Sequence, residues 1–154
     1  MDTSFQNPVL NRSWLALHRR EPSALKVLVV EDDKTQWPLW ESILKSCSRD
    51  VEIDWETTQS GAECLLRHAF QMNRHYSLVI SDIFLEGEGN GVDLWTHYGE
   101  AADNFIFVSG LSLSKVDAMI NMHFGTPLYL KKPLSPSVCK EMIKSLCFKG
   151  DGYE

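Results

Sequence analysis

Acidic, hydroxyl and amine side chains directly follow four short apolar runs of the sequence. In chain order these runs lead into Glu31-Asp32-Asp33, Asp82, Ser109 and Lys131-Lys132. Carboxylates gathered within a few ångströms repel one another, and each contact at 4 Å costs about 4 kcal/mol at an effective dielectric near 20. A bound cation or the protonation of one acid relieves this repulsion.

The same residue types suit the handling of a phosphoryl group. Mg²⁺ prefers oxygen ligands, and proteins bind it through one or two carboxylates together with waters and phosphate oxygens. Beside such a metal, a lysine supplies positive charge and a serine supplies a hydrogen bond to phosphoryl oxygens. An aspartate in such a site can itself be the nucleophile and form an acyl phosphate. The pattern therefore predicts phosphoryl transfer to an aspartate.

The elements that would carry these side chains are strands alternating with helices. Five apolar or alternating segments, at 25–30, 51–57, 77–81, 104–108 and 128–130, are typical of short strands. Amphipathic stretches follow them, such as the one whose apolar stripe contains Trp40, Ile43, Leu44 and Cys47. This order predicts an α/β fold, a doubly wound parallel sheet with helices on both faces. Ligands of such sheets bind beyond the carboxyl ends of the strands, where the four runs would converge.

Three helix starts can be assigned from local signals. Ser60 with Glu63 three residues later forms a capping-box pattern, and Ser135 before Pro136 is typical of an N-cap followed by the first helical residue. Asp33 is better suited to begin or cap the first helix than to bind metal.

Composition limits the class of protein. The chain has 154 residues, a net charge of −6, 44% hydrophobic residues and no long apolar run. These values fit one globular domain and predict neither a membrane-spanning helix nor a nucleic-acid partner. The four cysteines are widely spaced, which favours free thiols and a cytoplasmic location over a zinc site or disulfides.

Taken together, the segments resemble the receiver domains of two-component response regulators over nearly all of 25–149. The resemblance rests on Val-Leu-Val-Val-Glu-Asp-Asp (27–33), Leu-Val-Ile-Ser-Asp (78–82), Ile-Phe-Val-Ser (106–109) and Tyr-Leu-Lys-Lys-Pro (129–133). Each motif is weak alone, but their order and spacing at strand ends are specific. The resemblance implies a flavodoxin-like receiver fold with the strand order 2-1-3-4-5.

The resemblance also implies a role for each residue of the site. Asp82 would be the phospho-acceptor, and Glu31, Asp32, Asp82 and the backbone carbonyl of Phe84 would hold Mg²⁺. Ser109 would be the switch hydroxyl, Tyr129 the switch aromatic and Lys132 the phosphate-pairing lysine, with a cis Lys132–Pro133 bond. Phe84 and Leu111 occupy the positions that tune how water reaches the acyl phosphate. Because both are bulky and apolar, we expect slow autodephosphorylation.

The expected organisation is an extension over 1–24, with a short docked helix around Trp14–Leu17, then a receiver domain over 25–149 and a tail over 150–154. This length leaves no room for a DNA-binding output module, so a stand-alone receiver acting on a downstream protein is expected. A histidine kinase or a histidine phosphotransfer protein of a phosphorelay would donate the phosphoryl group. Signalling would use the surface of the fourth helix, fifth strand and fifth helix, which is also the expected homodimer interface.

Two other classes of protein are compatible with the same sequence features. The chain would otherwise be a pseudo-receiver, an interaction module of the same fold that does not use phosphorylation. A small aspartate-nucleophile phosphatase is a second rival, although such enzymes carry Asp-x-Asp after the first strand and this chain has Asp82-Ile83-Phe84 after the third. We expect no metabolic enzyme, only self-phosphotransfer. Tyr129 has the alternative role of an ordinary core aromatic.

Overall fold

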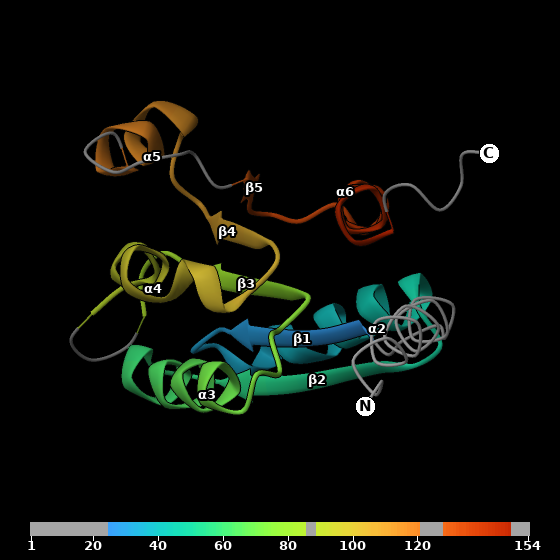
Figure 1. Cartoon of the computed structure of the whole chain (residues 1–154). Coiled ribbons are helices and arrows are strands. Elements are labelled where there is room, and N and C mark those ends of the chain that lie inside the picture. The colour runs from blue at the N-terminus through green and yellow to red at the C-terminus, as the bar shows by residue number, and fades with distance from the viewer. Residues whose placement is uncertain (1–24, 86–88, 121–127, 149–154) are drawn as a thin grey trace, which may run out of the picture.

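Five parallel strands form the centre of the molecule in a computed structural model that describes residues 25–85, 89–120 and 128–148 (Figure 1). They are β1 (Leu25–Val30), β2 (Val51–Glu56), β3 (Leu78–Asp82), β4 (Phe105–Ser109) and β5 (Leu128–Lys131). The strand order is β2-β1-β3-β4-β5, and every pairing is parallel. The predicted fold class and strand order are therefore confirmed.

Five α-helices cover the two faces of this sheet within the described ranges. They are α2 (Trp37–Cys47), α3 (Gln59–Gln71), α4 (Gly91–Tyr98), α5 (Leu113–Ile120) and α6 (Pro136–Cys147). Helices α2 and α6 lie on one side of the sheet, and α3, α4 and α5 lie on the other (Figure 1). The buried side chains of these two groups belong to two separate core clusters. Short 3-10 helices, η1 (Lys34–Gln36) and η2 (Gly99–Ala101), complete the connections.

The central strand β1 shows why the sheet is covered on both sides. Val27 and Val29 pack into the cluster on the α2 side, whereas Leu28 and Val30 pack into the cluster on the α3 side. All four are fully or almost fully buried. Because alternate residues of a strand point to opposite faces, a run of apolar residues is what a doubly covered strand requires.

The helix starts follow the sequence signals with one exception. Ser135 caps α6 and Asp33 caps η1, as predicted. The predicted capping box at Ser60 is wrong, because Thr58 is the N-cap of α3 and its hydroxyl accepts a hydrogen bond from the amide of Gly61 at 3.1 Å. Thr58 has extended backbone angles, as an N-cap requires, so the helix begins one residue before Ser60.

Several predictions lie outside the described residues. These are the extension over 1–24 with its helix around Trp14–Leu17 and the tail over 150–154. The four cysteines are described, and all are free thiols. Across the described ranges, no helix combines the length and apolar character that a bilayer crossing requires.

Candidate functional site

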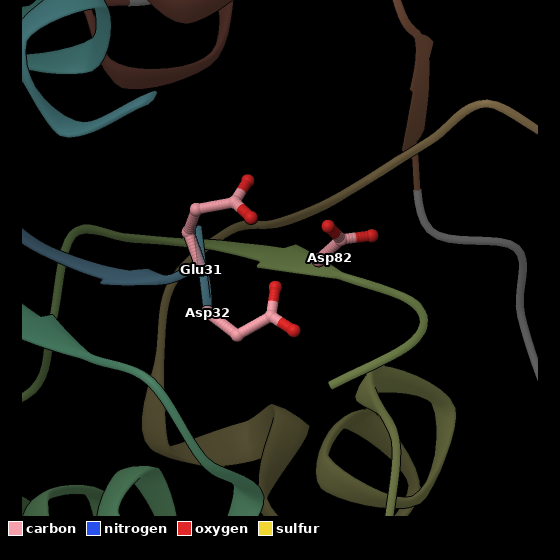
Figure 2. Close-up of side chains that lie close together, drawn as sticks. All are labelled: Glu31, Asp32 and Asp82. Atoms are coloured by element: carbon pink, nitrogen blue, oxygen red, sulfur yellow. The ribbon is translucent and has the colours of Figure 1, made fainter. Parts of the chain in front are cut away.

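Three carboxylates meet beyond the carboxyl ends of β1 and β3. Glu31 and Asp32 directly follow β1, and Asp82 is the last residue of β3. One carboxylate oxygen from each residue lies within 4.8 Å of the others, and Figure 2 shows the three side chains around one small space. The parallel pairing of β1 with β3 brings them together, because residues about 50 positions apart reach the same edge of the sheet.

The protein environment makes it costly for this cluster to carry three negative charges. Glu31 is almost completely buried. Burial and, to a lesser extent, the charge of Asp82 raise the pKa of its carboxyl group to about 7, against the lowering effects of the Asp33 amide and the Lys132 ammonium. The side chain of Asp82 is itself only 12% exposed. A cation would relieve this repulsion.

Lys132 brings one positive charge to the cluster from the end of β5. Its Nζ lies 2.9 Å from Oδ2 of Asp82 and 3.2 Å from Oε1 of Glu31. Burial opposes the charge of this lysine, but the hydrogen bond to Asp82 and the two carboxylate charges raise its pKa overall. The Lys132–Pro133 peptide bond is cis. The neighbouring Lys131 is exposed to solvent, as the strand alternation predicted.

Ser109 and Tyr129 form a connected pair beside the cluster. Ser109 ends β4 and is buried, and its hydroxyl accepts a hydrogen bond from the amide of Leu111 at 3.1 Å. The Tyr129 hydroxyl donates to the backbone carbonyl of Ser109 at 3.0 Å and also contacts that of Leu111. Burial raises the pKa of Tyr129. The tyrosine is therefore anchored to the turn after Ser109.

The segment after Asp82 is held close to its own strand. Phe84 forms an isolated backbone bridge with Asn90, and the amide of Gly91 donates to the carbonyl of Ile83 at 2.8 Å. A Cβ atom on Gly91 would lie 2.3 Å from the carbonyl oxygen of Asp82, so only glycine permits this approach. The Phe84 side chain is 55% exposed.

Gln59 was not identified as a functional candidate from the sequence, although it holds this same segment. Its side-chain oxygen accepts a hydrogen bond from the amide of Asn90 at 2.7 Å, and its nitrogen donates to Glu63 at 2.7 Å. Gln59 belongs to α3, more than 30 residues before Asn90 in the chain. No local motif marks such a long-range clamp.

The donor set fits Mg²⁺ better than a softer metal. All three side chains offer carboxylate oxygens, with neither histidine nor cysteine among them, and hard cations prefer such ligands. The adjoining lysine would pair with an anion bound to the metal, which matches a site for phosphate together with Mg²⁺.

Comparisons with known proteins agree with this geometry. No protein-family model matches the chain. The chain is 32% identical over 113 residues to the two-component response regulator ARR11 of Arabidopsis thaliana and 29% identical over 113 residues to the two-component response regulator ORR26 of Oryza sativa subsp. japonica. Each match covers 73% of this chain but only 20% and 18% of those proteins. The chain thus spans about a fifth of the length of the curated relatives it matches.

A solved structure supports the same fold. The two-component response regulator from Cytophaga hutchinsonii superposes with a TM-score of 0.66 at 19% identity, over 82% of this chain and 100% of that one. The fold is thus that of a flavodoxin-like α/β domain whose functional edge holds acids, a hydroxyl and a lysine. The described part of the chain thus has the fold of that response regulator and is similar in sequence to two-component response regulators.

Proposed function

We propose that this receiver domain is a phosphorylation-dependent switch in which Asp82 accepts a phosphoryl group in the presence of Mg²⁺. The observation that carries the proposal is the contact of one ammonium group, that of Lys132, with both Asp82 and Glu31. An ion pair that served stability alone would need one carboxylate. An excess of carboxylates around one lysine instead suits a site that gains a cation and a phosphoryl group during its cycle.

The positions of these groups support one transfer step. A carboxylate oxygen of Asp82 attacks phosphorus, the P–N bond of a phosphohistidine breaks, and its electron pair leaves with the partner's imidazole. When bound, Mg²⁺ neutralises negative charge on the phosphoryl oxygens and on the acids. Lys132 would pair with a phosphoryl oxygen, and Glu31, Asp32, Asp82 and the backbone carbonyl of Phe84 would hold the metal. The donor is a histidine kinase or a histidine phosphotransfer protein.

The switch step involves Ser109 and Tyr129. A phosphorylated side chain carries about −1.5 to −2 charges at pH 7 and strong acceptor oxygens. The Ser109 hydroxyl would turn from the Leu111 amide to donate to one of these oxygens. Since the Tyr129 hydroxyl is hydrogen-bonded to the backbone of the same turn, the tyrosine ring would move with that turn. To change the population ratio of the switched to the unswitched conformation from 1:99 to 99:1, phosphorylation must supply ~5.5 kcal/mol of differential stabilisation.

The output surface would be formed by α5, β5 and α6. Leu128 of β5 and Val138 of α6 are exposed apolar side chains there. Tyr129 belongs to the same strand, so a change in its position would alter this surface. A downstream protein, or a second copy of the chain in a homodimer, would bind it.

The lifetime of the phosphorylated state depends on how readily water reaches the acyl phosphate. The exposed Phe84 ring and the half-buried Leu111 would restrict water at the acyl phosphate and slow autodephosphorylation.

Residues 25–149 would be the functional unit, in the cytoplasm, with 1–24 and 150–154 outside it.

Labelling with a small phosphodonor tests the proposal directly. The protein is incubated with acetyl phosphate and Mg²⁺, and the phosphorylated residue is mapped by borohydride trapping and mass spectrometry. We expect one label on Asp82, which disappears in Asp82→Asn and when EDTA replaces Mg²⁺. Asp117→Asn removes an exposed acid of α5 and should label normally. If the unmutated protein gains no label, a pseudo-receiver becomes the better description.

A further inference from the structure

The acidic turn after β1 is held by an indole group through its backbone. Nε1 of Trp37 donates a hydrogen bond to the backbone carbonyl of Glu31 at 3.2 Å. The amide of Glu31 donates to the carbonyl of Glu56 at 2.9 Å, which extends the pairing of β1 with β2 by one residue. Both backbone groups of Glu31 are therefore occupied at the point where the chain leaves the sheet.

The indole is itself held in one orientation. Its ring stacks on Trp55 of β2, with centroids 4.9 Å apart and planes inclined by 25°. The ammonium of Lys34 lies 5.4 Å from the centroid of the Trp37 ring. Stacked aromatic pairs and cation–π contacts each favour a defined ring position. The edge strand β2 thus determines where the indole N–H points.

This orientation bears on the metal-binding acids through one peptide group. The carbonyl that Trp37 contacts belongs to the peptide group that joins Glu31 to Asp32. Fixing its plane limits the directions in which the Asp32 side chain can leave the backbone. On the other side of the turn, the amide of Asp33 donates to Oε2 of Glu31 at 3.1 Å. The turn is thus fastened both through its backbone and through the Glu31 carboxylate.

We propose that Trp37, held by Trp55, is a positioning residue that orients Glu31 and Asp32 for Mg²⁺. The inference rests on the proposed function, since it assumes that these two acids bind the metal. Trp37 makes no contact with the reacting groups in this role, and it acts through the Glu31–Asp32 peptide group. A tryptophan that served packing alone would change the free energy of unfolding without changing the affinity for Mg²⁺.

Two matched substitutions separate the hydrogen bond from the stacking. Trp37→Phe removes the N–H donor but keeps an aromatic ring opposite Trp55. Trp55→Phe keeps the donor on Trp37 together with an aromatic neighbour. The affinity of each full-length protein for Mg²⁺ is measured by isothermal titration calorimetry, and urea unfolding of the metal-free proteins verifies that each variant is folded.

We expect Trp37→Phe to weaken Mg²⁺ binding two- to fivefold, where fivefold corresponds to the roughly 1 kcal/mol of one neutral hydrogen bond. Trp55→Phe should bind Mg²⁺ within 1.5-fold of the unmutated protein, a margin of about 0.2 kcal/mol. Without metal, the ¹⁵N resonance of the Asp32 amide should shift in Trp37→Phe and stay in place in Trp55→Phe, because this amide shares the peptide group with the Glu31 carbonyl.

The outcomes distinguish this inference from the function on which it rests. If the unmutated protein binds Mg²⁺ and Trp37→Phe binds it equally well, the positioning role is wrong while the proposed function stands. If both tryptophan variants lose the same affinity, the stacking matters rather than the hydrogen bond, and the inference is also overturned. If the unmutated protein binds no Mg²⁺, the proposed function itself fails.

Discussion

Replacing Asp82 with asparagine should separate the stability of the metal-free fold from the stability that a cation supplies. The substitution keeps the shape of the side chain and removes one of three clustered negative charges. It also removes the charge that Lys132 contacts at 2.9 Å. The effect on the metal-free protein therefore depends on whether the lost attraction or the relieved repulsion is larger.

The distances allow an estimate of both terms. At an effective dielectric near 20, opposite charges at 2.9 Å attract by about 6 kcal/mol. Two like charges 4.8 Å apart repel by about 3.5 kcal/mol at the same dielectric, and Asp82 faces two other carboxylates within that distance. Because the pKa of Glu31 is about 7, this residue is only partly charged near neutral pH, and the two repulsions together roughly balance the attraction. We therefore expect metal-free Asp82→Asn to be as stable as the unmutated protein within about 1 kcal/mol, a margin that the same comparison sets.

Saturation with Mg²⁺ should make the unmutated protein more stable than Asp82→Asn. A ligand at 100 times its dissociation constant stabilises the native state by about 2.7 kcal/mol. The unmutated protein should gain this amount, and Asp82→Asn should gain less because it has lost one carboxylate ligand. The assay is urea unfolding followed by circular dichroism, in EDTA and in excess Mg²⁺, with Asp117→Asn as a control that removes one exposed charge. A loss of 2 kcal/mol or more by Asp82→Asn in EDTA, twice the margin from the Coulomb comparison, would refute the charge balance.

Three further substitutions probe the core, the loop and the lifetime of the phosphorylated state. Tyr76→Phe removes the hydroxyl that donates to Asp54 at 2.7 Å, and should lower the free energy of unfolding by about 1–2 kcal/mol in urea. Gly91→Ala places a Cβ against the carbonyl of Asp82, and should cost about 1–3 kcal/mol in urea and reduce labelling by acetyl phosphate. Phe84→Asn should speed the decay of the acyl phosphate, followed by loss of radiolabel.

Each of these has a control in the same structure. Tyr98→Phe removes a hydroxyl that contacts only the exposed Arg67 side chain among the described hydrogen bonds, and should change stability by less than about 0.5 kcal/mol. Gly110→Ala adds a Cβ that meets no atom within 4 Å, so equal losses for the two glycines would contradict the steric explanation. Phe70→Asn replaces a ring that is 63% exposed and should leave the decay rate of the acyl phosphate unchanged. If Phe84→Asn also leaves this rate unchanged, Phe84 does not shield the acyl phosphate.

The sequence was sufficient to predict the strands and the acids at their ends. Apolar runs such as Val27–Val30 are the pattern of doubly covered strands, and Glu31 and Asp82 directly follow two of them. The carboxyl ends of parallel strands lie at a common edge of the sheet. Local sequence patterns that locate these ends therefore predict that residues far apart in the sequence meet there. The missed cap at Thr58 shows the limit of such patterns, since Ser60 is by type at least as good a cap residue as Thr58 and only the backbone angles distinguish them.

The amino-acid sequence by itself determined which side chains are available for chemistry and in which order the strands carry them. The tertiary structure decided which partners these side chains have. It brought Lys132 to Glu31 across 101 positions and aimed Trp37 at the carbonyl of the same residue, with Trp55 of the edge strand behind it. Such contacts depend on side-chain direction and on strand pairing at distances of a few ångströms. Neither residue type nor local periodicity encodes these two properties until the sheet has formed.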